Sequence, residues 1–138
     1  MKPLIIHHVA AALLSVALTG CVALLPPDLP AEARGVALVP VSSGFVRVRL
    51  PLLQAHDGQL QLSGTVAREI GSSSTDQTHL EISFFDAAGN LLRATTTEFS
   101  PRNLVTRYPG RSGSYSLTLE SLPTGTARIE VRAHQDGP

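Results

Sequence analysis

Three of the five histidines and one run of hydroxyl side chains are the residues considered for catalysis or metal binding. His56, His79 and His134 show none of the H-x-H, H-x₃-H or H-E-x-x-H spacings that place two ligands on one face of one element. Residues 71–76 together with His79 include the serine, histidine and aspartate of a hydrolytic triad. They lack the G-x-S-x-G elbow that fixes a serine nucleophile. The same Gly, Ser and Thr composition is typical of a surface loop. The sequence therefore predicts no catalytic residue, no metal ligand, no cofactor and no small-molecule substrate, and the protein is not expected to be an enzyme.

Length and charge exclude further classes of function. The chain has 138 residues, 43% of them apolar and 16% charged, which is ordinary for one globular domain. Eleven basic residues are balanced by eleven acidic ones, so no electrostatic footprint for nucleic acid is present. A single cysteine excludes an intramolecular disulfide framework.

That cysteine, Cys21, ends a pattern typical of an export signal. Lys2 precedes an apolar stretch at 9–18, and Leu18-Thr19-Gly20-Cys21 follows. The apolar stretch is about half of the roughly 20 residues that a membrane-spanning helix requires. We therefore expect a signal peptide that is removed rather than a retained membrane span.

The tetrapeptide resembles the lipobox of bacterial lipoproteins, which is L-x-G-C in outline. This resemblance implies that residues 1–20 are the signal peptide, that the chain is cut after Gly20, and that Cys21 carries the lipid. Two or three acyl chains, at about 0.8 kcal/mol per buried methylene, hold a protein essentially permanently on a membrane. Because Val22 rather than Asp follows the cysteine, the resemblance implies a lipid-anchored protein on the periplasmic face of the outer membrane. In the alternative interpretation, Cys21 is a buried apolar residue after an ordinary signal peptide.

Residues 21–34 connect this anchor to the body of the protein. Pro26, Pro27 and Pro30 exclude a regular helix and favour an extended, semi-rigid linker. Leu24 and Leu25 could instead dip into the membrane interface. The folded domain is expected at 35–138.

Within this domain, apolar and polar residues alternate with a period of two, which predicts strands with one buried face and one solvated face. No window of helical length carries a 3.6-residue apolar period. Seven strands are predicted, at 36–41, 45–50, 59–66, 78–86, 91–98, 114–120 and 127–133. Seven short strands separated by polar turns indicate an all-β fold, an antiparallel β-sandwich, because one sheet alone would leave its apolar face in water.

Turn residues support these boundaries. Gly89 and Asn90 favour a turn at 87–90, Pro109-Gly110 interrupts the connection at 100–113, and residues 122–125 are predicted to close the last strand pair.

Residues 60–133 resemble the FxLyD-type domains of bacterial envelope proteins, which are immunoglobulin-like sandwiches. Ile82, Phe84, Phe85 and Asp86 stand at the F-x-L-y-D strand of that family. The resemblance implies two core residues, a flanking aromatic residue and an aspartate that starts a turn. The end of the chain is also similar to a fibronectin type III domain, although Ala127 stands where that fold has a tyrosine.

Two features are candidates for contacts with a partner. The connection at 100–113 is long and carries arginine and tyrosine, which are enriched in binding hot spots. The second feature is Phe85, an aromatic side chain on the outward face of its predicted strand. Such a side chain either packs under a loop or marks a partner surface. The candidate contact residues are Arg102, Arg107, Tyr108, Arg111 and Phe85.

These features predict a non-enzymatic binding or assembly module, such as a pilotin-like or accessory protein, that contacts another envelope protein. The alternatives are that 100–113 is merely a mobile loop, or that the protein is a periplasmic carbohydrate binder or small enzyme using that loop. The absence of tryptophan argues against sugar stacking.

Overall fold

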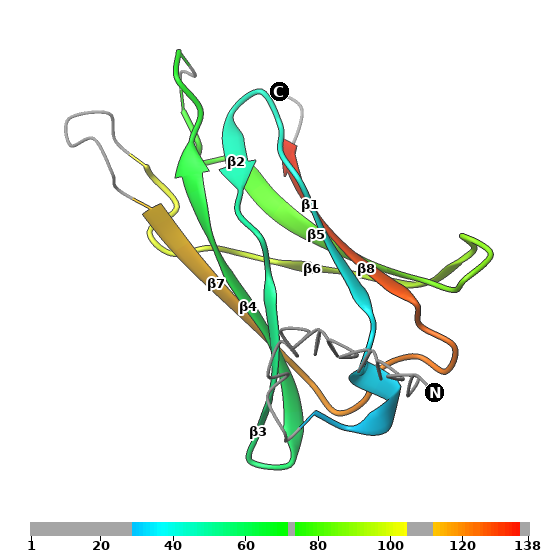
Figure 1. The fold of residues 1–138 in the computed structure, drawn as a ribbon. Coiled ribbons are helices and arrows are strands. Elements are labelled where there is room, and N and C mark those ends of the chain that lie inside the picture. Colours follow the sequence, from blue (N-terminus) through cyan, green and yellow to red (C-terminus); the bar gives the residue numbers. More distant parts are fainter. Residues whose placement is uncertain (1–28, 72–73, 105–111, 136–138) are drawn as a thin grey trace, which may run out of the picture.

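The computed structural model describes residues 29–71, 74–104 and 112–135. The predicted signal peptide, Cys21 and most of the predicted linker lie outside these residues. The described part is all-β apart from one 3-10 turn, η1 (Ala31–Ala33). Two sheets pack face to face, which confirms the predicted β-sandwich (Figure 1). Among the described residues, no helix is long and apolar enough to cross a membrane.

The first sheet has the strand order β1-β8-β5-β6. Its members are β1 (Ala37–Val41), β8 (Arg128–Gln135), β5 (Thr78–Phe85) and β6 (Leu91–Thr97). The β8–β5 and β5–β6 pairs are antiparallel, as predicted. The β1–β8 pair is parallel, with Ala37 opposite Arg128, so one strand pair departs from the antiparallel pattern.

The second sheet is built around β4 (Gln59–Arg68). One edge of β4 pairs with β7 (Ser112–Leu119), and the other pairs with β2 (Val46–Val48) and then β3 (Leu52–His56). Strands β2 and β3 are two parts of one strand that is interrupted around Pro51. The proline nitrogen carries no hydrogen and cannot donate a hydrogen bond to β4. The Arg49 N–H group still donates to the Thr65 carbonyl at 3.0 Å, so the interrupted strand stays beside β4.

All seven predicted strands are present, and β3 is an eighth that the alternation does not predict. Adjacent leucines at 52 and 53 obscure the period of two in this segment. The hairpin that joins β3 to β4 turns through Asp57 and Gly58, whose φ angles are 49° and 77°. An Asp-Gly pair with two positive φ angles is the preferred two-residue hairpin turn.

The core lies between the inward faces of the two sheets. Alternate residues of β2, β4, β5, β7 and β8 reach it, as the sequence pattern predicts, and Ile82 and Phe84 of β5 are fully buried. The apolar residues with no exposed surface are Val46, Leu62, Val66, Leu80, Ile82, Phe84, Leu104, Ile129 and Val131.

The turn predicted at 87–90 is confirmed, and together with Asp86 it forms the hairpin between β5 and β6. Asp86 starts it by accepting hydrogen bonds from the Asn90 backbone N–H group at 2.8 Å and from the Asn90 side-chain amide at 2.9 Å. Gly89 adopts a φ of 87°. These hydrogen bonds hold the pKa of the Asp86 carboxyl below its usual value, the side-chain bond from Asn90 having the largest effect.

The prediction that residues 122–125 close the last strand pair is wrong. The two strands on either side, β7 and β8, belong to different sheets, so this segment carries the chain from one sheet to the other. Leu122 is buried, and the Thr126 hydroxyl donates to the Pro123 carbonyl at 2.6 Å. Proline and glycine set the local backbone angles in either kind of connection, so they do not indicate which sheet the next strand joins.

Candidate functional site

The described part of the predicted 100–113 loop is anchored to the body of the protein. Phe99 and Leu104 are buried. The Thr75 hydroxyl, also buried, donates to the Arg102 carbonyl at 2.6 Å and accepts from the Leu104 N–H group at 3.0 Å. Ser100 exchanges two backbone hydrogen bonds of 2.9 Å with Ser114 of β7. Residues 99–104 are therefore held in place at several points.

The predicted partner-contact residues do not form one described patch. The Arg102 guanidinium pairs with the Glu98 carboxylate at 3.0 Å on the surface. Arg107, Tyr108 and Arg111 lie outside the described residues. Phe85 is the last residue of β5. The guanidinium carbon of Arg128, on the neighbouring strand β8, is 4.3 Å from the centre of the Phe85 ring. This half-buried ring is therefore partly covered by a cation within its own sheet.

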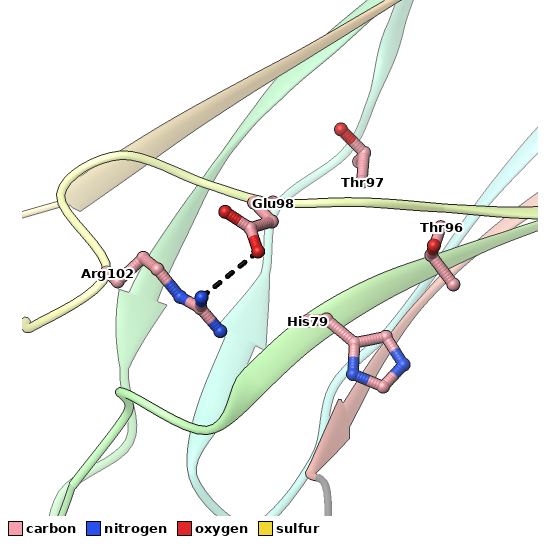
Figure 2. A pocket seen from close by; sticks show the side chains of 5 residues that line it. All are labelled: His79, Thr96, Thr97, Glu98 and Arg102. Carbon is pink, nitrogen blue, oxygen red and sulfur yellow. Dashed lines mark hydrogen bonds and ion pairs between the residues drawn. The ribbon is translucent and has the colours of Figure 1, made fainter.

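A hollow where β5 begins and β6 ends contains several polar side chains (Figure 2). It is lined by His79, Thr96, Thr97, Glu98 and Arg102. Leu80, Ile82 and Phe84 point inward from β5, so the odd-numbered residues of that strand, His79 among them, point outward. Figure 2 shows the His79 ring beside Thr96, and the Glu98 carboxylate joined to Arg102.

His134 lies next to this hollow on the neighbouring strand. It stands directly opposite His79 in the β5–β8 pairing. The two imidazole rings are stacked, with their centres 5.7 Å apart and their planes 10° apart. The two histidines lie on different strands, so the spacing of residues within one strand cannot reveal this pair.

The β6 edge is the second candidate surface. Its seven residues contain no proline, no lysine and no carboxylate. Leu91 is 58% exposed and Leu92 is 39% exposed, and the strand pairs only with β5 among the described strands. A long edge with apolar and threonine side chains and few charges is a template for pairing with another strand.

The other three sheet edges are obstructed. Pro40 interrupts the hydrogen-bonding groups of β1, and the edge formed by β2 and β3 is broken around Pro51. The edge of β7 is occupied at Ser114 by its two hydrogen bonds with Ser100. Among the described strands, β6 thus offers the longest uninterrupted edge.

The buried Tyr115 hydroxyl is a further unusual polar group. It has no hydrogen-bond partner among the described residues, and Tyr115 is 4% exposed. Burial raises the pKa of this phenol to about 12. The side chain lies across β4 over Gly64, its partner in the β4–β7 pairing. Its environment is therefore that of a core residue rather than a reactive group.

Among the described residues, no group of three or more histidine, cysteine, aspartate or glutamate side chains could hold a metal ion. Comparison with known proteins finds no matching protein family, no matching curated protein and no matching solved structure. The arrangement of β6 and of the histidine hollow therefore has to be interpreted from its own chemistry.

Proposed function

We propose that this chain is a non-enzymatic binding module tethered to the periplasmic face of the bacterial outer membrane by lipid on Cys21. The tether is supported by the resemblance of Leu18-Thr19-Gly20-Cys21 to a lipobox and by the proline-rich segment that follows. The binding role is supported by the open edge of β6. Another envelope protein is the expected partner.

The proposed mechanism is strand addition. An extended segment of the partner pairs with β6 through main-chain hydrogen bonds, and Leu91 and Leu92 offer apolar contacts for its side chains. Tethering confines the domain to one surface, so a modest affinity for another protein on that surface is enough to keep the two together.

The hydrogen-bond directions along β6 follow from its neighbours. The Phe85 carbonyl accepts from the Ala127 N–H group at 2.8 Å, so the odd-numbered residues of β5 direct their backbone groups toward β8. The even-numbered residues of β5 then pair with β6, and Ile82 stands opposite Thr95. The backbone groups of Ala94 and Thr96 consequently point to the open edge.

This geometry provides a precise test. Ala94→Pro removes an N–H group that faces the open edge and leaves the pairing of β5 with β6 intact, because proline is tolerated on an edge strand when its nitrogen faces solvent. The matched control is Ala94→Thr, which keeps the N–H group and a side chain favoured in strands.

The measurement is chemical crosslinking in whole cells, followed by identification of the proteins attached to each variant. We expect the Ala94→Pro chain to lose the partner that the natural chain and Ala94→Thr retain, while its thermal midpoint stays close to that of the control. A proline variant that is folded and still captures the same partner would contradict strand addition at β6.

The alternative of a carbohydrate binder or small enzyme depends on the 100–113 loop. The part of this loop that could bind a ligand includes residues 105–111, which lie outside the described residues. The described part supplies Arg102, already paired with Glu98.

A further inference from the structure

Arg93 is the one charged residue of β6, the strand with the open edge. It stands opposite Phe84 in the β5–β6 pairing, and Phe84 is fully buried in the core. Residues directly opposite each other share a face of the sheet, so Arg93 also lies on the inner face, at the border of the core. Its guanidinium carbon is 6.0 Å from the centre of the Phe84 ring. The open edge therefore carries a single positive charge at a defined place.

This charge is left without a carboxylate. Arg47, Arg102 and Arg132 are each paired with a glutamate. Arg93 is exposed, and among the described residues no carboxylate forms an ion pair with it. An exposed guanidinium beside an open edge can accept a carboxylate from another chain without first giving up one of its own.

A hollow of about 300 Å³ adjoins Arg93. Its other lining residues are 118–121, where β7 ends. Glu120 is the one acid in this lining, and it forms no ion pair with Arg93. There is consequently space beside the guanidinium, on the inner side of the edge, for a side chain that comes from an added strand.

The hydrogen-bond directions of β6 determine which residue of an added strand meets Arg93. The backbone groups of Ala94 and Thr96 point to the open edge, so an antiparallel strand forms its hydrogen-bonded pairs with these two residues. Arg93 then lies at a non-hydrogen-bonded position, where opposite Cα atoms are about 4.5 Å apart and side chains are closest. Opposite charges in such a pair are stabilising, and like charges are destabilising.

A second copy of this chain does not supply that charge. Two β6 strands paired antiparallel, edge to edge, are related by a two-fold axis perpendicular to the sheet, so inward residues of one copy face inward residues of the other. The inward residues of β6 are Arg93, Thr95 and Thr97. Glu98, which follows them, has the parity of the outer face. A partner with its own acidic residue therefore fits this edge better than a copy of β6.

We propose that Arg93 selects the partner of β6, an extended segment of another envelope protein that carries aspartate or glutamate opposite Arg93 and β-branched residues opposite Thr95 and Thr97. This inference rests on the strand addition proposed above. Main-chain hydrogen bonds provide the affinity, and the charge provides the identity and the register. The register depends on such a charge because three consecutive threonines, at 95–97, distinguish poorly between one alignment and the next.

The test uses synthetic peptides with blocked ends that match the seven residues of β6 in length. Valine and threonine alternate in them, and the fifth residue is glutamate, glutamine or lysine. In antiparallel pairing the first five residues run opposite Thr97 to Arg93, so the fifth faces Arg93. Each peptide is titrated into the full chain in detergent, and NMR follows the Ala94 and Thr96 amide signals.

Four variants separate the charge of Arg93 from its bulk. Arg93→Gln removes the charge, Arg93→Glu reverses it, and Arg93→Lys keeps it. The matched control is Arg49→Gln, which removes an exposed positive charge from the other sheet.

We expect the glutamate peptide to bind the natural chain about 1.5–5-fold more tightly than the glutamine peptide, and the lysine peptide to bind most weakly. Arg93→Lys and Arg49→Gln should keep this order, Arg93→Gln should abolish it, and Arg93→Glu should reverse it. The preference should shrink at about 1 M salt, where charges are screened beyond about 3 Å, while the glutamine peptide should be affected less.

The outcomes distinguish this inference from the proposal on which it rests. If no peptide binds, or if Ala94→Pro leaves binding unchanged, strand addition at β6 is wrong and the role of Arg93 is wrong with it. If Ala94→Pro abolishes binding but the three peptides bind equally well, or if Arg93→Gln keeps the preference for glutamate, β6 still accepts a strand and the selection by Arg93 alone is refuted.

Discussion

Adding a single methyl group at Gly64 should lower the free energy of unfolding substantially. It lies in β4 opposite Tyr115 of β7. A Cβ atom at residue 64 would be 2.5 Å from the Tyr115 hydroxyl oxygen and 2.7 Å from the Cζ atom of the same ring. Both distances are far below the 3.5–4.0 Å at which carbon contacts are favourable. Gly64→Ala therefore forces the buried tyrosine ring to move.

The expected magnitude follows from two opposing effects. Overpacking a core position destabilises a protein by about 1–3 kcal/mol. Replacing glycine inside a strand recovers about 0.5–1 kcal/mol of chain entropy, and the φ angle of Gly64 is not positive, so alanine adds no backbone strain. A contact of 2.5 Å places the overpacking cost in the upper half of its range, so the net loss should be about 1–2 kcal/mol, which lowers the melting temperature of a domain of this size by about 5–15 °C.

The assay is urea unfolding of Gly64→Ala beside a matched control, Gly44→Ala. The control methyl meets no atom within 4 Å and the φ angle there is also not positive. That variant should be neutral or slightly more stable. In a Tyr115→Val background the ring is absent, and Gly64→Ala should then have little effect.

A double-mutant cycle over residues 64 and 115 should give a coupling of about 1 kcal/mol or more. The reasoning is refuted if Gly64→Ala is as stable as Gly44→Ala, or if its effect is the same with and without the tyrosine ring.

Three further predictions concern other parts of the chain. Cys21→Ser should leave the membrane fraction and appear as a soluble or unprocessed form, and unchanged partitioning into detergent would remove the basis for the lipid anchor. Thr75→Val should lose about 1–3 kcal/mol in urea unfolding because the buried Leu104 N–H group loses its acceptor, whereas Thr75→Ser keeps the hydroxyl and should lose much less. Because burial raises the pKa of Tyr115 to about 12, the folded state keeps the phenol proton more tightly than the unfolded chain does. The resulting stabilisation of the folded state is complete below pH 10 and is lost between about pH 10 and 12. Phenolate absorbance of a Tyr108→Phe chain, in which Tyr115 is the one remaining tyrosine, should show this late ionisation.

The strands could be predicted from sequence because their signal is local. In β5, Leu80, Ile82 and Phe84 alternate with polar residues, and this period alone determines which side chains enter the core. The hairpin at 86–90 was equally accessible, since Asp86 and Gly89 act within five residues of each other. The β3 strand was missed although its Asp57-Gly58 turn is a strong hairpin signal, because Pro51 and paired leucines hide the alternation around it.

The pairing of strands could not be predicted in the same way. Whether residues 122–125 form a hairpin or a crossover depends on which sheet has a free edge for β8, and that is decided by the rest of the chain. For the same reason, the sequence did not place His134 beside His79. The open edge of β6 also follows from its position at the end of a sheet, which its own residues do not encode.

The parallel pairing of β1 with β8 joins the first and the last of the described strands, so β1 waits during synthesis for β8. Until residues 128–135 have emerged from the ribosome, β1 has no strand to join in its sheet, and β5 has a partner on one side alone. Contacts this distant in sequence form late, so the first sheet is completed after the second, whose strands all precede residue 120. The C-terminal strand therefore acts as the closing step of assembly, and a chain cut short before it should remain a substrate for proteases.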